Sequence, residues 1–345
     1  MIKNFILKNN SPSVFIIAEI GVNHNGSIKI AKKLIQKAKK IGADAVKFQT
    51  FKADNLALKK APKANYQKKN YNKKFISQYG MLKSLEFTNK MHIECIKECK
   101  KNNIYFLSSP FDLESILYLK KLGLRTFKIP SGEITNYQYL KLIGSLNYQV
   151  IMSTGMSTLS EIKEAIRLLN VSGTKKKNIN LLHCNTEYPT PFEDANLNAI
   201  KTLKEKFKIN VGYSDHTQSI EASLAAVALG AKIIEKHITI NNNFSGPDHK
   251  ASLDVKEFSK LVEKIRNIEK ALGRGKKIPT KSEIKNIPIV RKSLVALKDI
   301  EINENFSKLN LTAKRPGIGI SPMKFKKLIK KKAKKKYKKN EIIVL

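Results

Sequence analysis

The sequence predicts a (β/α)8 barrel followed by a small β-rich domain, and three observations support this fold class. Short apolar runs recur between residues 14 and 237, and each ends in a polar or ionisable residue. Helical patterns separate most of these runs. The 345 residues can hold a barrel of ~250 residues and one further domain. Because the strands of such a barrel end at one mouth, the terminal residues of the runs are expected to share one site.

Each apolar run is predicted to be a strand. The runs are VFIIAE, AVKFQ, YFLSS, TFKIPS, QVIMS, INLLHC, NVGYSDH and KIIEKH. A first helix is expected to begin near Ser27, a residue type that favours the N-cap position. Later helices are expected at about 112–122, 137–145, 158–170, 196–207, 219–229 and 255–271. The long polar segment 51–74 is expected to be a loop that folds over the mouth as a lid.

The barrel domain is expected to span residues 1–272. Residues 273–290 have few apolar side chains and two prolines, so they predict a linker. From residue 291 the pattern changes to short β-like runs, which predict a separate domain over 291–345. A domain of this size has a marginal core, so we expect it to pack against another surface.

The formal net charge is +38, which raises the possibility of nucleic-acid binding. Arginine supplies only six of the 66 basic residues, however, and base-reading proteins favour its planar donors. Lysines that coat solvated helix faces are the favoured interpretation, and no specific nucleic-acid partner is expected. The alternative from another functional class is a nucleic-acid-binding protein on an inactive barrel. The positive field would also attract a small anionic substrate.

The three cysteines and the hydropathy pattern predict a cytoplasmic protein. Cys95 and Cys99 lie four residues apart in a helical pattern, so buried structural thiols are expected. No apolar stretch reaches the ~18 residues of a membrane span, and no membrane partner is expected.

Two lysines on predicted strands indicate an anion site. Lys47 shares one strand face with Gln49, and Lys128 lies near the end of another strand. A lysine that points into a barrel near its mouth needs an anionic partner, whereas one that points outward would only meet solvent. Hydroxyls also lie at strand ends: Ser109, Ser131, Ser153 and Ser214. Together these groups fit phosphate or carboxylate, although each serine alone could be a helix N-cap.

Two histidines at strand ends indicate a divalent metal. His216 and His237 end runs that are neighbours in the predicted barrel, although a lone histidine is more often structural than a ligand. Two protein ligands hold a metal weakly, so substrate or water oxygens are expected to complete the shell. Glu19, Glu133 and Asp248 are candidates for general bases, acceptors for sugar hydroxyls, or turn residues.

Several motifs along the chain, in order, resemble those of the bacterial sialic acid synthases. They are AEIGVNHNGS, VKFQTFKAD, SSPFD, FKIPSGEITN, STGMST, LLHCNTEYPTPFED, VGYSDHT, IEKHIT and SGPDHKAS. The C-terminal KSLVA and KRPGIGISPM resemble that family's antifreeze-like (SAF, β-clip) domain. The resemblance runs from about residue 14 to the C-terminus.

The resemblance implies a metal-dependent condensation of phosphoenolpyruvate with an N-acetylated mannose-type sugar, in which phosphate leaves with C–O cleavage. We expect N-acetylmannosamine as acceptor and N-acetylneuraminate as product. The alternative is an N,N'-diacetyllegionaminate synthase that uses 2,4-diacetamido-2,4,6-trideoxymannose. Mn²⁺ is the expected ion, with Mg²⁺ or Co²⁺ as alternatives.

The resemblance also assigns roles to individual residues. It implies phosphoenolpyruvate contacts from Lys47, Lys128, Ser109, Ser131, Ser153 and Ser214. It implies sugar contacts from Glu19, Gln49, Tyr188 and Asp248, and metal ligation by His216 and His237. Glu133 matches a glutamate that handles the attacking water. Arg315 matches an arginine that reaches the sugar of the other subunit, which implies a domain-swapped homodimer.

Overall fold

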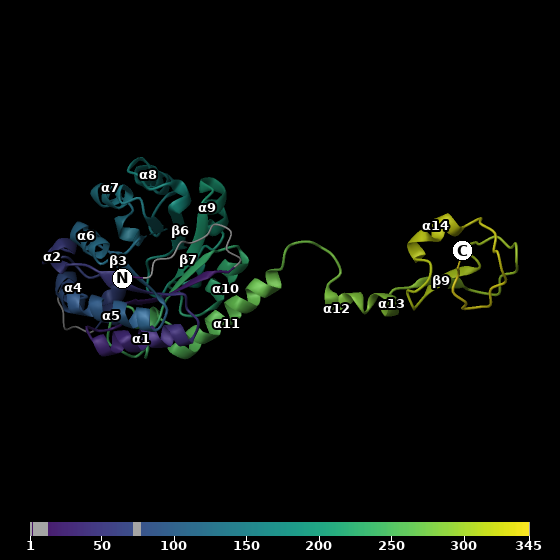
Figure 1. Cartoon of the computed structure of the whole chain (residues 1–345), viewed down its shortest axis with the longest axis horizontal. Coiled ribbons are helices and arrows are strands. Elements are labelled where there is room, and N and C mark those ends of the chain that lie inside the picture. Colours follow the sequence, from purple (N-terminus) through teal and green to yellow (C-terminus); the bar gives the residue numbers. More distant parts are fainter. Residues whose placement is uncertain (1, 3–12, 72–76, 345) are drawn as a thin grey trace. The chain divides into compact units, whose positions relative to one another are not determined.

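The computed structural model describes residues 2, 13–71 and 77–344 (Figure 1). The chain forms two compact units, Met1–Gly273 and Arg274–Leu345. Among the described residues, no helix has both the length and the apolar composition needed to cross a membrane.

The first unit is built on eight parallel strands in the order β3-β2-β1-β8-β7-β6-β5-β4. The strands are β1 (Phe15–Gly21), β2 (Ala45–Thr50), β3 (Tyr105–Pro110), β4 (Thr126–Ile129), β5 (Gln149–Ser153), β6 (Ile179–Cys184), β7 (Asn210–Asp215) and β8 (Ile233–His237). β3 and β4 lie beside each other, which brings the two ends of the sheet together. The predicted (β/α)8 barrel is therefore confirmed.

Helices follow the strands and surround them (Figure 1). The helices of the barrel are α1 (Ile28–Lys40), α5 (Asn89–Lys101), α6 (Leu113–Lys121), α7 (Tyr137–Ser145), α8 (Leu159–Val171), α9 (Ala199–Phe207), α10 (Glu221–Ala228) and α11 (Val255–Leu272). The hydroxyl of Ser27 accepts a hydrogen bond from the Ile30 amide, so Ser27 is the N-cap of α1, as the sequence predicts.

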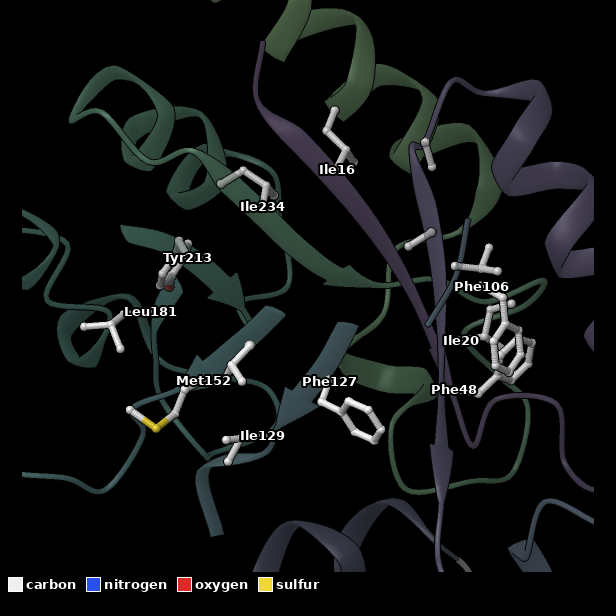
Figure 2. Packing of buried hydrophobic residues seen from close by; sticks show 14 of the residues in the cluster. Ile16, Ile20, Phe48, Phe106, Phe127, Ile129, Met152, Leu181, Tyr213 and Ile234 are labelled. Atoms are coloured by element: carbon white, nitrogen blue, oxygen red, sulfur yellow. The ribbon is translucent and has the colours of Figure 1, made fainter. Parts of the chain in front are cut away.

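Alternating strand residues build two apolar layers. Residues on the outer face of the strands fill the space beneath the helices, and Figure 2 shows them from close by. Those labelled there include Ile16, Ile20, Phe48, Phe106, Phe127, Met152, Leu181 and Ile234. A second, smaller cluster consists of Ile17, Ala45, Leu107, Ile151, Leu182 and Ile233, and it fills the barrel interior.

The inner layer determines where the polar side chains lie. Because side chains alternate along a strand, the residue two positions after an inner apolar residue points into the barrel one layer closer to the mouth. Glu19 follows Ile17 in this way, and Lys47 follows Ala45. On β7 the inner position is Gly212, where an added Cβ would lie 2.4 Å from the Ile233 carbonyl oxygen. The apolar inner layer therefore fills the barrel below the polar side chains, which lie closer to the mouth.

The expectation of a loop over 51–74 is partly wrong. The segment contains two short helices, α2 (Ala53–Leu56) and α3 (Asn65–Asn70), and its residues 72–76 lie outside the described part. Asn70 at the end of α3 donates from Nδ2 to the carbonyl oxygens of Tyr188 and Pro247, at 3.1 and 3.2 Å. Both acceptors follow barrel strands, so α3 lies at the mouth. A further helix, α4 (Gln78–Leu85), buries Met81 and Leu85.

The second unit is β-rich and has its own core. β9 (Ser293–Ala296) and β10 (Leu311–Lys314) pair antiparallel, and Ile342 forms a bridge to Val295. A buried cluster that includes Phe306 and Tyr337 lies beneath them. The segment expected to be a linker contains two one-turn helices, α12 (Lys281–Ile284) and α13 (Ile287–Val290). A short helix, α14 (Phe325–Leu328), completes the unit.

Candidate active site

Four buried charged side chains meet at the mouth of the barrel. The Nζ atom of Lys47 lies 2.8 Å from Oε2 of Glu19 and 3.8 Å from Oε2 of Glu235. The other oxygen of Glu235, Oε1, lies 3.5 Å from the Nζ atom of Lys128. Each of these side chains is at most 5% exposed. Lys47 and Lys128 therefore both point inward, as the sequence predicts, and each has an anionic partner.

Three of the four predicted serines belong to this cluster. Lys47 donates to the Ser109 hydroxyl at 3.0 Å, and Lys128 donates to Ser153 at 2.6 Å. Ser214 donates to Oε1 of Glu235 at 2.8 Å. The helices after β3, β4 and β5 are capped instead by Asp112, Asn136 and Thr158. The alternative that the serines at these strand ends are N-caps is therefore wrong.

Ser131 lies beside the cluster without joining it. Its hydroxyl accepts from the Gly155 amide at 3.1 Å and lies 3.3 Å from Sγ of Cys184. Gly155 must be small here, because an added Cβ would lie 2.8 Å from the Ser131 oxygen. The hydroxyl and the amide are thus held together at the ends of β4 and β5.

The two histidines lie side by side, with ring centroids 5.7 Å apart. Nδ1 of His216 donates to the Asn185 carbonyl oxygen at 2.6 Å, which leaves the lone pair on Nε2. Nδ1 of His237 is buried and has no hydrogen-bond partner among the described residues. Burial lowers the pKa of His216 to about 4 and the pKa of His237 well below its ordinary value. Both rings are therefore neutral. Nε2 of His216 lies 3.4 Å from the Ser214 hydroxyl, and each ring keeps a nitrogen lone pair, which fits metal ligation.

Within the described chain, no group of three or more histidine, cysteine, aspartate or glutamate side chains has the geometry of a metal site. The nearest carboxylate to His237 is that of Asp248, whose Oδ2 lies 3.9 Å from Nδ1. A metal held by this pair would therefore need ligands from substrate or water, as the sequence analysis expects.

Residues implied to contact sugar surround the histidines. At Gly21, which has φ +53°, an added Cβ would lie 3.1 Å from Oε1 of Glu19, 3.3 Å from Nε2 of Gln49 and 3.3 Å from Cε1 of His237. The ring of Tyr188 lies 4.1 Å from the ring of His216. Strands β1, β2 and β8 and the segment after β6 thus bring these groups together.

Aromatic packing extends the site toward α3. The ring of Tyr66, on α3, lies 5.0 Å from the ring of Tyr188. Burial raises the pKa of both phenols, so both remain neutral donors. Tyr66 is not among the predicted site residues, because a tyrosine in a polar segment carries no signal of its position.

Glu133 is not part of the central cluster in the contacts that the structure records. Glu133 accepts a hydrogen bond from Asn136 at 2.7 Å, and burial raises the pKa of its carboxyl. Arg315 belongs to the second unit, where its Nε donates to the Val290 carbonyl oxygen. Their implied roles stay predictions.

Glu235 is the central residue that the sequence analysis missed. It bridges both lysines, and the desolvation of its carboxyl is outweighed by their charges, so its pKa lies below its ordinary value. The signal was present in the run IIEKH, because Glu235 lies two residues before His237 and must share its face. At Glu19, burial outweighs the charge of Lys47 and raises the pKa of the carboxyl to about 7.

Asp248 gives the site a pH-dependent stability. Burial raises its pKa from 3.8 to about 7, so the folded chain keeps a proton that the unfolded chain loses. The free energy of unfolding must therefore fall as pH rises from about 4 to about 7. Asp248→Asn removes this dependence. Between pH 4 and pH 7 the free energy of unfolding of the variant should therefore rise by up to roughly 4 kcal/mol relative to that of the wild type. Urea unfolding at about pH 5 and about pH 8, without added metal, measures it. An equal difference between the two proteins at both pH values would contradict the assignment.

Comparison with known proteins identifies the family. The family model described as the NeuB family matches residues 34–277. The chain is 57% identical to an N,N'-diacetyllegionaminic acid synthase of Campylobacter jejuni over 95% of this chain and 98% of the relative. It is 43% identical to the N,N'-diacetyllegionaminic acid synthase of Legionella pneumophila over 93% of this chain and 91% of the relative.

Among solved structures, an N-acetylneuraminic acid synthetase of Leptospira borgpetersenii, in complex with citrate, has a TM-score of 0.70. It is 36% identical and covers 83% of this chain and 96% of its own. The range that the family model matches, residues 34–277, includes Lys47, Lys128, Glu235 and both histidines. The chain therefore belongs to the NeuB family, the sialic acid synthase family that its motifs predict, and it is an enzyme.

Proposed function

We propose that this enzyme condenses phosphoenolpyruvate with 2,4-diacetamido-2,4,6-trideoxymannose to give N,N'-diacetyllegionaminic acid and phosphate. The observation that carries the proposal is the 57% identity to a legionaminic acid synthase over 95% of the chain. This favours the alternative acceptor over the N-acetylmannosamine that the sequence analysis put first. The reaction class is the same for both sugars.

The lysine cluster supports binding of phosphoenolpyruvate. Lys47 and Lys128 supply two buried ammonium groups, and Ser109 and Ser153 lie within hydrogen-bond distance of them. Charge-assisted hydrogen bonds from such donors suit a phosphate and a carboxylate. Holding both substrates in attack geometry removes an entropic barrier worth ~7–11 kcal/mol in favourable cases.

His216 and His237 would hold a divalent ion, for which Mn²⁺ is our first choice. When bound, the ion would act as a Lewis acid toward the sugar aldehyde. The chain itself would orient the sugar through Gln49, Asp248 and the Tyr188 ring, which lies against His216. Burial of these groups would exclude bulk water from the reacting atoms.

The chemistry balances without an oxidant or reductant. Carbon C3 of phosphoenolpyruvate forms a bond to the aldehyde carbon, and the aldehyde oxygen gains a proton to become a hydroxyl. Water adds at C2, and the tetrahedral intermediate then breaks the C–O bond to phosphate and becomes the 2-keto acid. Glu133, through its raised pKa, would receive the proton of that water.

Arg315 would serve the acceptor sugar of a second subunit, which makes the proposed active form a domain-swapped homodimer. Its support is the family resemblance of the KRPG motif. The exposed position of Arg315 in the second unit is compatible with such a role.

Phosphate release with Mn²⁺ and phosphoenolpyruvate tests the acceptor. We expect kcat/KM for 2,4-diacetamido-2,4,6-trideoxymannose to exceed that for N-acetylmannosamine by at least about tenfold, which is ~1.4 kcal/mol of transition-state binding. A faster reaction with N-acetylmannosamine would instead identify a neuraminate synthase. No release with either sugar would refute both acceptors.

A further inference from the structure

We propose that Glu235 is a positioning residue that holds Lys47 and Lys128 at one anion-binding point before substrate arrives. The inference rests on the proposed function for the identity of the anion, phosphoenolpyruvate. The contacts are direct, because the two oxygens of one carboxylate face the two ammonium groups at 3.8 and 3.5 Å. Nothing in the resemblance assigns a role to this residue.

The charge balance of the cluster explains the need for Glu235. Lys47 has a second carboxylate, Glu19, at 2.8 Å. Lys128 has Glu235 alone within ion-pair distance among the described residues. A charge this deeply buried is costly unless it is paired. Without Glu235, two lysines of like charge would share a buried site with one carboxylate, and Lys128 would have only the Ser153 hydroxyl.

The position of Glu235 is itself defined by its surroundings. Ser214, on the neighbouring strand β7, donates to Oε1, the same oxygen that faces Lys128. Glu235 also lies in the middle of β8, whose ladders with β1 and β7 immobilise the backbone. A carboxylate fixed in this way can pre-organise the two lysines, so that their orientation is complete before the anion binds.

Glu235→Gln separates charge from shape. The amide keeps the size of the side chain and an oxygen for the Ser214 hydroxyl, but it removes the negative charge. If Glu235 pre-organises the lysines, the dissociation constant and KM for phosphoenolpyruvate should rise at least about tenfold, the effect of losing one charge-assisted contact. The KM of the acceptor sugar should change less than about threefold. If the carboxylate only repels the incoming anion, phosphoenolpyruvate will bind more tightly, and the proposal is overturned.

Calorimetric titration of the full chain with phosphoenolpyruvate and Mn²⁺, and no sugar, measures the binding directly. Glu235→Asp keeps the charge and should recover part of the affinity. Lys128→Met should make the effect of Glu235→Gln smaller than it is in the wild type, because the part that acts through Lys128 is then lost and only the part through Lys47 remains. Full additivity of the two changes would contradict the mechanism.

Asp215→Asn is the matched control for stability. Asp215 pairs with Lys236 at 2.9 Å, and both side chains are fully buried, but this pair faces Thr217 and Ser223 instead of the lysine cluster. Asp215→Asn should lower the melting temperature and keep the affinity for phosphoenolpyruvate within about twofold of the wild-type value.

The titration also separates this inference from the proposed function. If the wild-type chain binds phosphoenolpyruvate but reacts with neither sugar, the proposed acceptor is refuted. The titrations of the variants then still test the role of Glu235. A wild-type chain that does not bind phosphoenolpyruvate refutes both proposals.

Discussion

Replacement of His216 or His237 by alanine is expected to reduce phosphate release by at least about a hundredfold. Lewis-acid stabilisation is worth several kcal/mol, and each 1.36 kcal/mol corresponds to a factor of ten in rate. The ring centroids lie 5.7 Å apart and both rings are neutral, so the loss of either leaves one protein ligand from this pair. Turnover should be measured after chelation and after return of Mn²⁺. Full restoration of a His216→Ala variant at micromolar metal would contradict the assignment.

His92→Gln is a matched control for this experiment. Burial lowers the pKa of His92 to about 4, as it does for His216, so the two side chains have similar environments. His92 instead lies on α5, where its ring contacts the Thr50 hydroxyl at 2.8 Å. The control should lose stability and keep the metal concentration that gives half-maximal rate. A shift of that concentration by His92→Gln would mean that general destabilisation, and not ligation, explains the effect.

Lys47→Met is expected to lower kcat/KM for phosphoenolpyruvate at least about a hundredfold. A hydrogen bond to a charged group contributes ~1.5–3 kcal/mol, and the substitution also leaves two carboxylates without this ammonium. The carboxylates of Glu19 and Glu235, 2.8 and 3.8 Å from Nζ, would then repel the incoming anion. Breaking a buried ion pair costs ~3–5 kcal/mol, so the melting temperature should fall as well.

Lys236→Met distinguishes a loss of binding from a loss of stability. Lys236 is fully buried, like Lys47, and pairs with Asp215 on the outer side of β7 and β8. Its substitution should lower the melting temperature by a similar amount and change KM for phosphoenolpyruvate less than about threefold. If both lysine variants lose phosphoenolpyruvate affinity equally, the anion site is not at Lys47.

Much of the barrel could be predicted because its signals are local. Short apolar runs specify strands, and the residues of each inner layer recur at every second position. The boundaries of α7 agree with the predicted helix, and Ser27 caps α1. The prediction of a loop over 51–74 was partly wrong, because α3 is held by contacts from Asn70 to Tyr188 and Pro247, which are distant in sequence. Such contacts leave no periodic pattern in the sequence.

Part of the site, like part of the fold, could be predicted from the sequence. That Lys47 and Lys128 lie on strands, and that His216 and His237 lie at strand ends, followed from the sequence alone, because strand direction places those ends at one mouth. The partners of these residues follow only from the folded barrel. It showed that Ser109 and Ser153 accept from lysines, and that Glu235 faces both ammonium groups. Partners on different strands are set by barrel closure and strand register, which bring together residues that are far apart in sequence.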